Sequence, residues 1–187
     1  MSALSYPDPP LGDDAVLLRP WRDADVDPAH AATQDPLIPR YTRVPRGQTK
    51  EGLRAFIAER ELRRHAGEVL SFVIADATGD AFLGTVALLR FDWDENRTEL
   101  GYWLAPGARG RGVATRAVTL LARWTLLHLG MARLSLTTDV GNVASQAVAE
   151  RAGFTREGVL RSFQVRDGRR FDIVMYSLLP ADLGQVG

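Results

Sequence analysis

The stretch ARGRGVATRA, residues 108–117, concentrates three arginines and two glycines in ten positions of a chain whose formal net charge is zero. Apolar residues at helical spacing begin inside it and continue as far as Gly130, at the positions Val113, Ala117, Leu120, Leu121, Trp124 and Leu127. The preceding segment RTELGYWLA, residues 97–105, is typical of a strand. The sequence therefore predicts a strand, a glycine-rich turn and a long helix with one buried face.

This turn has the features of an anion site. The first N–H groups of a helix lack intrahelical acceptors and the helix dipole is positive there, while glycine lets the backbone approach a phosphate closely. Arginine side chains could add charge-assisted hydrogen bonds. The alternative is that Arg109 and Arg111 are solvated and that the glycines only shape a turn. Neither the Gly-Lys-Ser/Thr loop of nucleoside triphosphatases nor the G-x-G-x-x-G dinucleotide motif is present, since Gly110 and Gly112 are followed by Thr115.

The other hydrophobic patterns predict an α/β fold in a single domain. A first strand ends at Pro20, Asp23 is expected to cap a helix, and residues 35–48 are expected to form a loop. A helix is predicted over 49–67, with Leu53, Phe56, Ile57 and Leu62 on its apolar face; strands are predicted at 69–76, 81–90 and 132–139, a short helix at 142–154, and a hairpin around Asp167-Gly168. Hairpins followed by a strand, helix and strand indicate a mixed central sheet flanked by helices.

Length and composition limit the class of protein. The 187 residues, 45% of them hydrophobic, suffice for one core, which we place at residues 15–182, after a proline-rich flexible tail at 1–14. Balanced charge argues against nucleic acid and anionic membranes as partners, and no apolar run is long enough for a membrane span. Zero cysteines and three widely separated histidines indicate no metal site, and a cytoplasmic location is expected.

Several motifs in order resemble the GNAT acetyltransferase superfamily. Arg109, Gly112 and Ala114 fill its Arg/Gln-x-x-Gly-x-Gly/Ala acetyl-CoA loop. ELGYWLAP (99–106), GNVASQAVAERAGF (141–154) and DGRRFDIVMYSLL (167–179) are similar to its branch of ribosomal-protein N-terminal acetyltransferases, and the resemblance runs from about Val16 to Leu179. It implies a single GNAT domain whose mixed sheet contains a splayed pair of parallel strands, with acetyl-CoA as co-substrate.

The resemblance also implies which residues bind the cofactor. The pyrophosphate would be held by the backbone N–H groups of residues 109–114, and the pantetheine arm would lie along the strand that ends at residues 101–105, like an extra strand in the splayed gap. Asn142 and Ser145 match an Asn-x-x-Ser that the family uses on the pantetheine arm and near the sulfur. The expected cofactor-binding residues are Trp103, Leu104, Arg109, Gly110, Arg111, Gly112, Val113, Ala114, Thr115, Asn142 and Ser145.

Acetyl transfer to an amine needs a base and a proton donor, because lysine side chains (pKa ~10.4) and chain N-termini (pKa ~8) are mostly protonated at neutral pH. We expect Glu99 to be the base, and a backbone N–H near Trp103 or Leu104 to stabilise the oxyanion. The alternative role of Glu99 is that of a strand carboxylate paired with a cross-strand arginine. We expect Ser145 to protonate the leaving thiolate, although a serine in a first helical turn can instead satisfy the backbone.

Two positions depart from the family pattern. The tyrosine donor of many GNAT enzymes, seven residues after the motif asparagine, is replaced by Ala149. In the ribosomal-protein branch, a glutamate that can act as base lies seven residues after the position of Glu157, and here it is Gln164, whose neutral amide cannot accept a full proton. The chain therefore relies on Glu99 or on water, or it serves a different substrate.

These observations favour an acetyl-CoA-dependent N-acetyltransferase that acts on a primary amine, either a protein N-terminus or a small molecule. A non-catalytic CoA or acyl-CoA sensor of the same fold is the alternative, whereas a phosphoryl-transfer enzyme would need a Walker lysine or a set of metal-binding carboxylates. The acceptor pocket is expected between the first helices, the loop at 39–45 and the terminal hairpin. Arg166, Arg169 and Arg170 could attract an acidic acceptor there or form a solvated tip. Family analogy alone suggests a homodimer.

Overall fold

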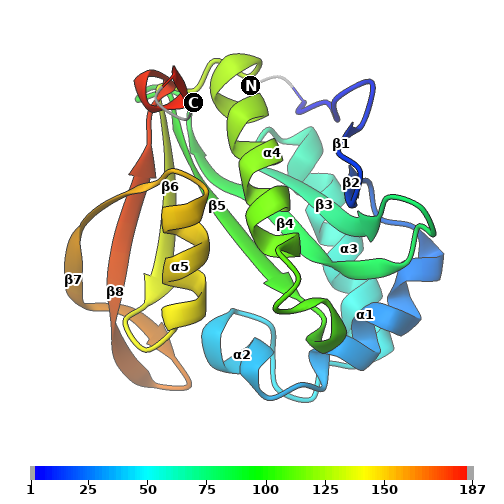
Figure 1. Ribbon diagram of the computed structural model, residues 1–187. Helices are drawn as coiled ribbons and strands as arrows, with labels where there is room; N and C mark the ends of the chain where they lie inside the picture. The colour runs from blue at the N-terminus through cyan, green and yellow to red at the C-terminus, as the bar shows by residue number, and fades with distance from the viewer. Residues whose placement is uncertain (1–2, 185–187) are drawn as a thin grey trace.

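The computed structural model describes residues 3–184, and one mixed sheet organises them (Figure 1). Eight strands within this range follow the order β1-β2-β3-β4-β5-β6-β8-β7. Their bounds are Leu11–Gly12 for β1, Val16–Arg19 for β2, Val69–Asp76 for β3, Phe82–Asp92 for β4, Arg97–Leu104 for β5, Arg133–Asp139 for β6, Thr155–Arg166 for β7 and Arg169–Leu178 for β8. The predicted strands and the terminal hairpin are confirmed, because their alternating apolar residues have a core to face.

The pair β5 and β6 is the only parallel one among these strands. Its pairing runs from Arg97 opposite Arg133 to Leu100 opposite Leu136 and then stops, although β5 continues to Leu104 and β6 to Asp139. The two strands diverge beyond this point (Figure 1). The mixed sheet with a splayed parallel pair, which the resemblance implies, is therefore confirmed.

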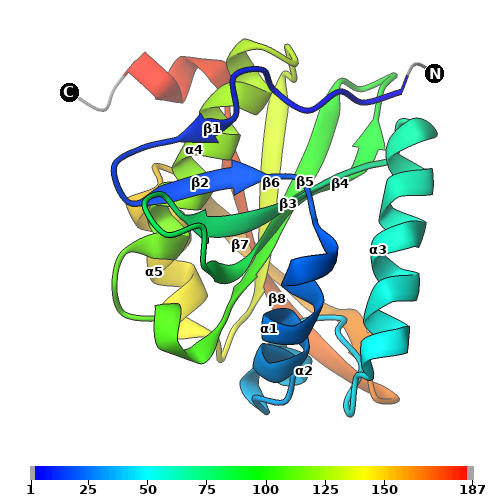
Figure 2. The ribbon, with the colours of Figure 1, turned by 90° about the vertical axis from the view of Figure 1, so that its right-hand side faces the viewer.

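Helices cover both faces of the sheet (Figure 2). The helices α4 (Val113–Leu127) and α5 (Val143–Arg151) lie on one face, and α1 (Val26–Thr33) and α3 (Lys50–His65) lie on the other. The larger core lies under α4, where Leu100, Leu121, Leu136 and Tyr176 are at most 1% exposed. Burying side chains of this size stabilises the fold by roughly 1.5–3 kcal/mol each, so this layer fixes α4 against the parallel pair.

A second, smaller cluster on the opposite face joins the first helices to β5. Val26, Ala29 and Leu53 are buried there, and Trp103 of β5 packs against them. Leu62, expected on the apolar face of α3, is instead 72% exposed. It lies outside both clusters, because α3 is covered mainly through its first half.

The N-terminal segment differs from the flexible tail expected at residues 1–14, whose first two residues lie outside the described range. Leu4 is 3% exposed and belongs to the larger core, the Tyr6 hydroxyl donates to the Ser71 carbonyl, and β1 pairs with β2. Prolines prevented a periodic pattern from forming but did not prevent packing, because an extended segment can bury single side chains without regular structure.

Two further expectations need correction. Asp23 does not cap an α-helix: residues Asp23–Asp25 form a short 3-10 turn, and α1 begins after Asp25, whose buried carboxylate pairs with Arg19 at 2.8 Å. The region 35–48 is not wholly a loop, since it contains the five-residue helix α2 (Leu37–Tyr41). Pro36 precedes this helix and Pro39 lies within its first turn, where proline is tolerated because no intrahelical N–H bond is needed.

Candidate active site

The glycine-rich turn immediately precedes α4 and adopts a backbone that only glycine accepts readily. Gly110 and Gly112 have φ values of 73° and 77°, in the left-handed region, and Gly112 is the residue that caps the helix. A Cβ added at either position would meet no protein atom within 4 Å. The glycines therefore serve the turn conformation and leave open space above it.

The N–H groups of this turn are available to a ligand. The N–H of Arg109 donates to the Pro106 carbonyl, and the N–H of Arg116 donates to the Gly112 carbonyl. Between them, the N–H groups of residues 110–115 find no acceptor among the residues that the structure describes. Six unpaired donors at the positive end of α4 form a cradle suited to a diphosphate. The N–H of Arg109, which was also expected to contribute, has the Pro106 carbonyl as acceptor at 3.3 Å, so its part in the cradle stays a prediction.

Two of the three arginines in residues 108–117 form ion pairs with other parts of the protein. Arg109 makes a two-pronged ion pair with Asp35, at 3.1 Å from each nitrogen, and also donates to the Leu104 carbonyl at 3.3 Å. Arg116 pairs with Asp13 and Asp14. Arg111 is exposed and has no carboxylate partner within residues 3–184, so it is the one whose charge is free for a ligand.

The end of β5 presents backbone groups to the point where β6 diverges. The N–H of Ala105 donates to the Leu83 carbonyl in β4, and bonding directions alternate along an antiparallel pair. The backbone polar groups of Trp103 therefore point toward β4, whereas those of Tyr102 and Leu104 point toward the unpaired edge. Of the two residues expected beside the thioester, Leu104 has its N–H on this edge and Trp103 does not, and Tyr102 has the other N–H there; their role in cofactor binding stays a prediction.

Ser145 lies at the start of α5 and faces this edge. Asn142 accepts a hydrogen bond from the Ser145 N–H at 3.2 Å and so caps the helix, while the Tyr102 hydroxyl donates to the Ser145 hydroxyl at 3.1 Å. Burial raises the pKa of the Tyr102 phenol, which keeps it protonated at neutral pH. Sequence reasoning missed Tyr102, although strand alternation already placed it on the face opposite Glu99.

Glu99 lies on the other face of β5 and is held on both carboxylate oxygens. Oε1 accepts from the Thr137 hydroxyl at 2.8 Å, and Oε2 pairs with the Arg90 guanidinium. The side chain is 18% exposed. The ion pair with Arg90 is the arrangement expected if Glu99 were only structural, so its role as base stays a prediction.

The two departures from the family pattern have clear surroundings. Ala149 is fully buried on α5, where there is no room for a tyrosine side chain without displacement of the core. Gln164 lies on β7, opposite Phe171 of β8. Glu157 pairs with Arg133 and accepts from the Ser177 hydroxyl, and these contacts lower its pKa to about 2, so it holds β7 to its neighbours.

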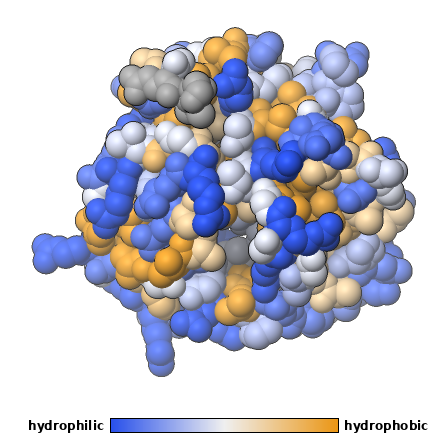
Figure 3. All heavy atoms as spheres, in the orientation of Figure 1, coloured by the Kyte–Doolittle hydropathy of each residue, from blue (hydrophilic) through white to orange (hydrophobic). Residues whose placement is uncertain are grey.

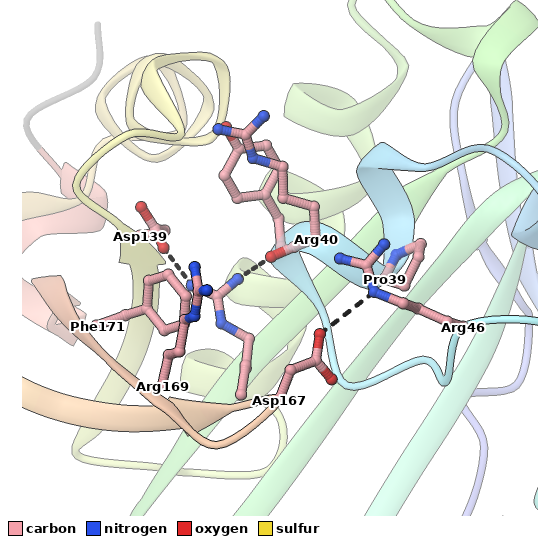
Figure 4. A pocket seen from close by; sticks show the side chains of 9 residues that line it. Pro39, Arg40, Arg46, Asp139, Asp167, Arg169 and Phe171 are labelled. Atoms are coloured by element: carbon pink, nitrogen blue, oxygen red, sulfur yellow. Dashed lines mark hydrogen bonds and ion pairs between the residues drawn. The ribbon is translucent and has the colours of Figure 1, made fainter.

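A cavity of about 560 Å³ opens between α2, the end of β6 and the β7–β8 hairpin (Figure 4). This is the region in which the acceptor pocket is expected. It is lined by Pro39, Arg40, Tyr41, Arg46, Asp139, Arg166, Asp167, Arg169 and Phe171. Asp139, which lines the cavity, lies two residues after Thr137 on the same face of β6, so the two residues are about 7 Å apart along the strand. Thr137 is the residue that donates to Glu99.

The glycine-rich turn and α5 lie on the face of the sheet opposite to the side chain of Glu99. The surface is hollowed between α4 and α5, and both hydrophilic and hydrophobic residues border the hollow (Figure 3). Within residues 3–184, no group of three or more His, Cys, Asp or Glu side chains is arranged to hold a metal ion. No helix in that range is both long enough and apolar enough to cross a membrane.

Comparison with known proteins places this geometry among the acetyltransferases. A family model described as "Acetyltransferase (GNAT) domain" matches residues 15–155. The chain is 36% identical over 96 residues to the "Putative ribosomal N-acetyltransferase YdaF" of Bacillus subtilis, which covers 51% of this chain and about half, 52%, of that relative. It is 26% identical over 169 residues to the "Uncharacterized N-acetyltransferase p20" of Bacillus licheniformis, covering 90% and 95% of the two chains.

Among solved structures, the fold is similar to that of RimL, a ribosomal L7/L12 alpha-N-protein acetyltransferase in complex with coenzyme A. The TM-score is 0.81 at 21% identity, and the match covers 89% of this chain and 95% of that one. At this identity, the likeness concerns the fold.

Proposed function

Because the chain belongs to the GNAT acetyltransferase family, we propose that it is an acetyl-CoA-dependent N-acetyltransferase that acetylates a primary amine. The observation that carries the proposal is the cradle at the start of α4, where the N–H groups of residues 110–115 have no acceptor within the described range. The open space above Gly110 and Gly112 leaves room for a diphosphate. When bound, acetyl-CoA supplies the activated acetyl group as a thioester.

The chain's own residues would divide the remaining work between the two faces of β5. Glu99 is proposed to take the proton from the acceptor ammonium, either directly or through a water. The N–H group of Leu104 faces the unpaired edge and would stabilise negative charge on the carbonyl oxygen. The Tyr102 hydroxyl, bonded to Ser145, would deliver a proton to the leaving sulfur. Ser145 is thus proposed to act together with Tyr102 instead of alone.

The names of the relatives favour a protein N-terminus as the acceptor, since YdaF is named a putative ribosomal N-acetyltransferase and RimL a ribosomal L7/L12 alpha-N-protein acetyltransferase. A small-molecule amine is the other acceptor class that this site could serve. Acetyl transfer to a panel of both classes, followed through release of the free thiol, tests the activity. Tight binding of acetyl-CoA with no transfer to any amine would favour the non-catalytic sensor, which the loss of the family tyrosine at Ala149 and glutamate at Gln164 would permit.

The cofactor assignment can be tested with a matched pair of variants. Gly112→Glu places a carboxylate in the cradle at the N-terminal end of α4, and Gly130→Glu places one beyond its C-terminal end. Both glycines have a positive φ, 77° and 68°, and open space around the missing side chain, so both substitutions strain the backbone similarly. We expect only Gly112→Glu to weaken acetyl-CoA binding in calorimetry. Equal affinity in the two variants would refute the cradle.

A further inference from the structure

The cavity beside β6 is rich in positive charge. Four arginines and two aspartates line it, which leaves an excess of two positive charges. Arg46 pairs with Asp167 at 3.3 Å, and Arg166 pairs with Asp139. Arg40 and Arg169 line the same cavity and have no carboxylate within ion-pairing distance in the described part of the chain. The Arg40 guanidinium lies over the Tyr41 ring, 5.1 Å from its centroid, whereas the Arg169 guanidinium is turned toward Asp139 and is available to an anion (Figure 4).

Arg166 supplies the buried part of this positive surface. Its side chain is 8% exposed, donates to the Arg40 carbonyl and the Asp139 carboxylate, and stacks at 4.2 Å over the Phe171 ring. Its Nε atom is buried and has no hydrogen-bond partner. A buried donor left without a partner is costly, and such groups are commonly satisfied by a ligand or water. This N–H is thus a donor of Arg166 that the described protein atoms leave unpaired beside the cavity.

The position of the cavity links it to the proposed reaction. Asp139 follows Thr137, the partner of Glu99, by two residues on the same strand face, and Tyr41 at the end of α2 donates to the Gly141 carbonyl just before α5. A molecule in the cavity would therefore lie next to the unpaired ends of β5 and β6. An acceptor amine at that edge could extend its remaining atoms into the cavity.

We propose that this cavity binds an anionic oxygen group of the acceptor, a carboxylate or a phosphate, so that the preferred substrates are amines bearing such a group a few bonds from the reacting nitrogen. The inference rests on the proposed acetyltransferase function and specifies its substrate class. Planar guanidinium groups suit both anions, because each can donate two parallel hydrogen bonds. Cationic amines such as polyamines would be repelled by the same surface.

Tetrapeptide amides with a free N-terminus test the proposal. They differ only at the second or third residue, which is aspartate, phosphoserine, asparagine or lysine; β-alanine and β-alaninamide form the matched small-molecule pair. Both kcat/KM for acetylation and direct binding by calorimetry are measured. We expect kcat/KM to be about ten- to a hundredfold higher for an acidic acceptor than for its neutral match, and lowest for lysine. The ratio of kcat/KM between the aspartate and phosphoserine peptides shows whether the cavity prefers a carboxylate or a phosphate.

Variants connect the preference to the cavity. Arg166→Gln and the exposed Arg169→Gln should each bring the ratio of kcat/KM between the acidic peptide and its asparagine match close to one. Arg123→Gln, on the exposed side of α4 away from the cavity, is the control and should keep the preference. Arg169→Gln keeps the test decisive if Arg166→Gln does not fold.

The outcomes separate this inference from the function on which it rests. Acetylation of acidic and neutral acceptors at equal rates would overturn the anion pocket and leave the acetyltransferase standing. Binding of acidic peptides without acetylation of any amine would overturn the proposed function instead. A wild-type preference that survives in both arginine variants would show that the cavity does not cause it. The absence of both peptide binding and acetyl transfer would overturn both proposals.

Discussion

Gly84→Ala should damage both the stability of the domain and the geometry of its reactive edge. Gly84 of β4 lies opposite Leu104, and its φ is 156°. An added Cβ would lie 2.3 Å from the Trp103 carbonyl oxygen and 2.9 Å from the Leu104 Cα. Both contacts are with backbone, so the methyl group can be accommodated only if the end of β5 moves away.

The size of the effect follows from these contacts. Relief of the overlap requires a shift of roughly 1 Å, because nonbonded carbon atoms prefer about 3.5 Å or more. Overpacking costs about 1–3 kcal/mol and the unfavourable backbone region a similar amount, so we expect a loss of about 2–6 kcal/mol in the free energy of unfolding. For a chain of this size, a loss near 4 kcal/mol lowers Tm by roughly 8–16 °C. A 1 Å displacement of the Leu104 N–H should also lower kcat by about a hundredfold.

Thermal unfolding and acetyl transfer below the lowered Tm measure the two effects separately. Gly107→Ala is the control, since it lies near the same strand end, has an ordinary φ and would meet nothing within 4 Å. It should change stability by less than about 1 kcal/mol. The reasoning fails if Gly84→Ala matches Gly107→Ala in Tm and turnover, and the placement of the reacting atoms fails if stability falls while turnover below Tm does not.

Three further predictions concern individual side chains. Glu99→Gln should lower kcat/KM at pH 7 by at least about a hundredfold and by much less at pH 9, where an N-terminal amine is already deprotonated. Arg90→Gln, which removes only the ion pair, should keep the wild-type pH profile. Identical profiles in all three proteins would show that Glu99 is not the base. Tyr102→Phe and Ser145→Ala should each slow turnover while leaving the acetyl-CoA Kd unchanged in calorimetry, and full turnover in both would leave the pair a structural role only. The pKa of Glu157 is about 2, below the ordinary 4.5, so the stabilisation by its carboxylate is complete above pH 4.5 and is lost as the pH falls toward 2. Because the side chain is 37% exposed, Glu157→Gln should lower the free energy of unfolding by only about 1 kcal/mol at pH 7. Urea titrations in which the difference between wild type and variant does not narrow below pH 4.5 would contradict the assignment.

Patterns that repeat along the chain made most of the fold predictable. The strands 69–76 and 97–105 and the helix after Gly112 were visible because their apolar spacing reflects the core that they face. The helix α2 was not, since five residues are too few to show a period and its prolines are typical of loops. The packing of Leu4 was hidden for a similar reason, because a single buried side chain in an extended segment leaves no pattern.

The candidate site was predictable in outline only. The glycine turn and the residues of β5 could be located because they are local in sequence. The partners of these residues could not, since Arg109 meets Asp35 and Tyr102 meets Ser145 across distances of 74 and 43 positions. The charged cavity joins three distant segments, so its composition was not available from any one stretch.

Four residue pairs join β5 to β6, and the strands separate beyond them. The backbone amides along this seam, the line between β5 and β6, therefore fall into two classes. Amide protons in the four pairs are protected by the hydrogen bonds of the sheet, whereas the amide protons of Tyr102 and Leu104 are free to exchange with deuterium from the solvent. An extended molecule seated against β5 would close these sites and slow their exchange, whether or not any bond is made or broken. Isotope uptake at two positions thus reports occupancy of the seam in the resting protein, independently of turnover.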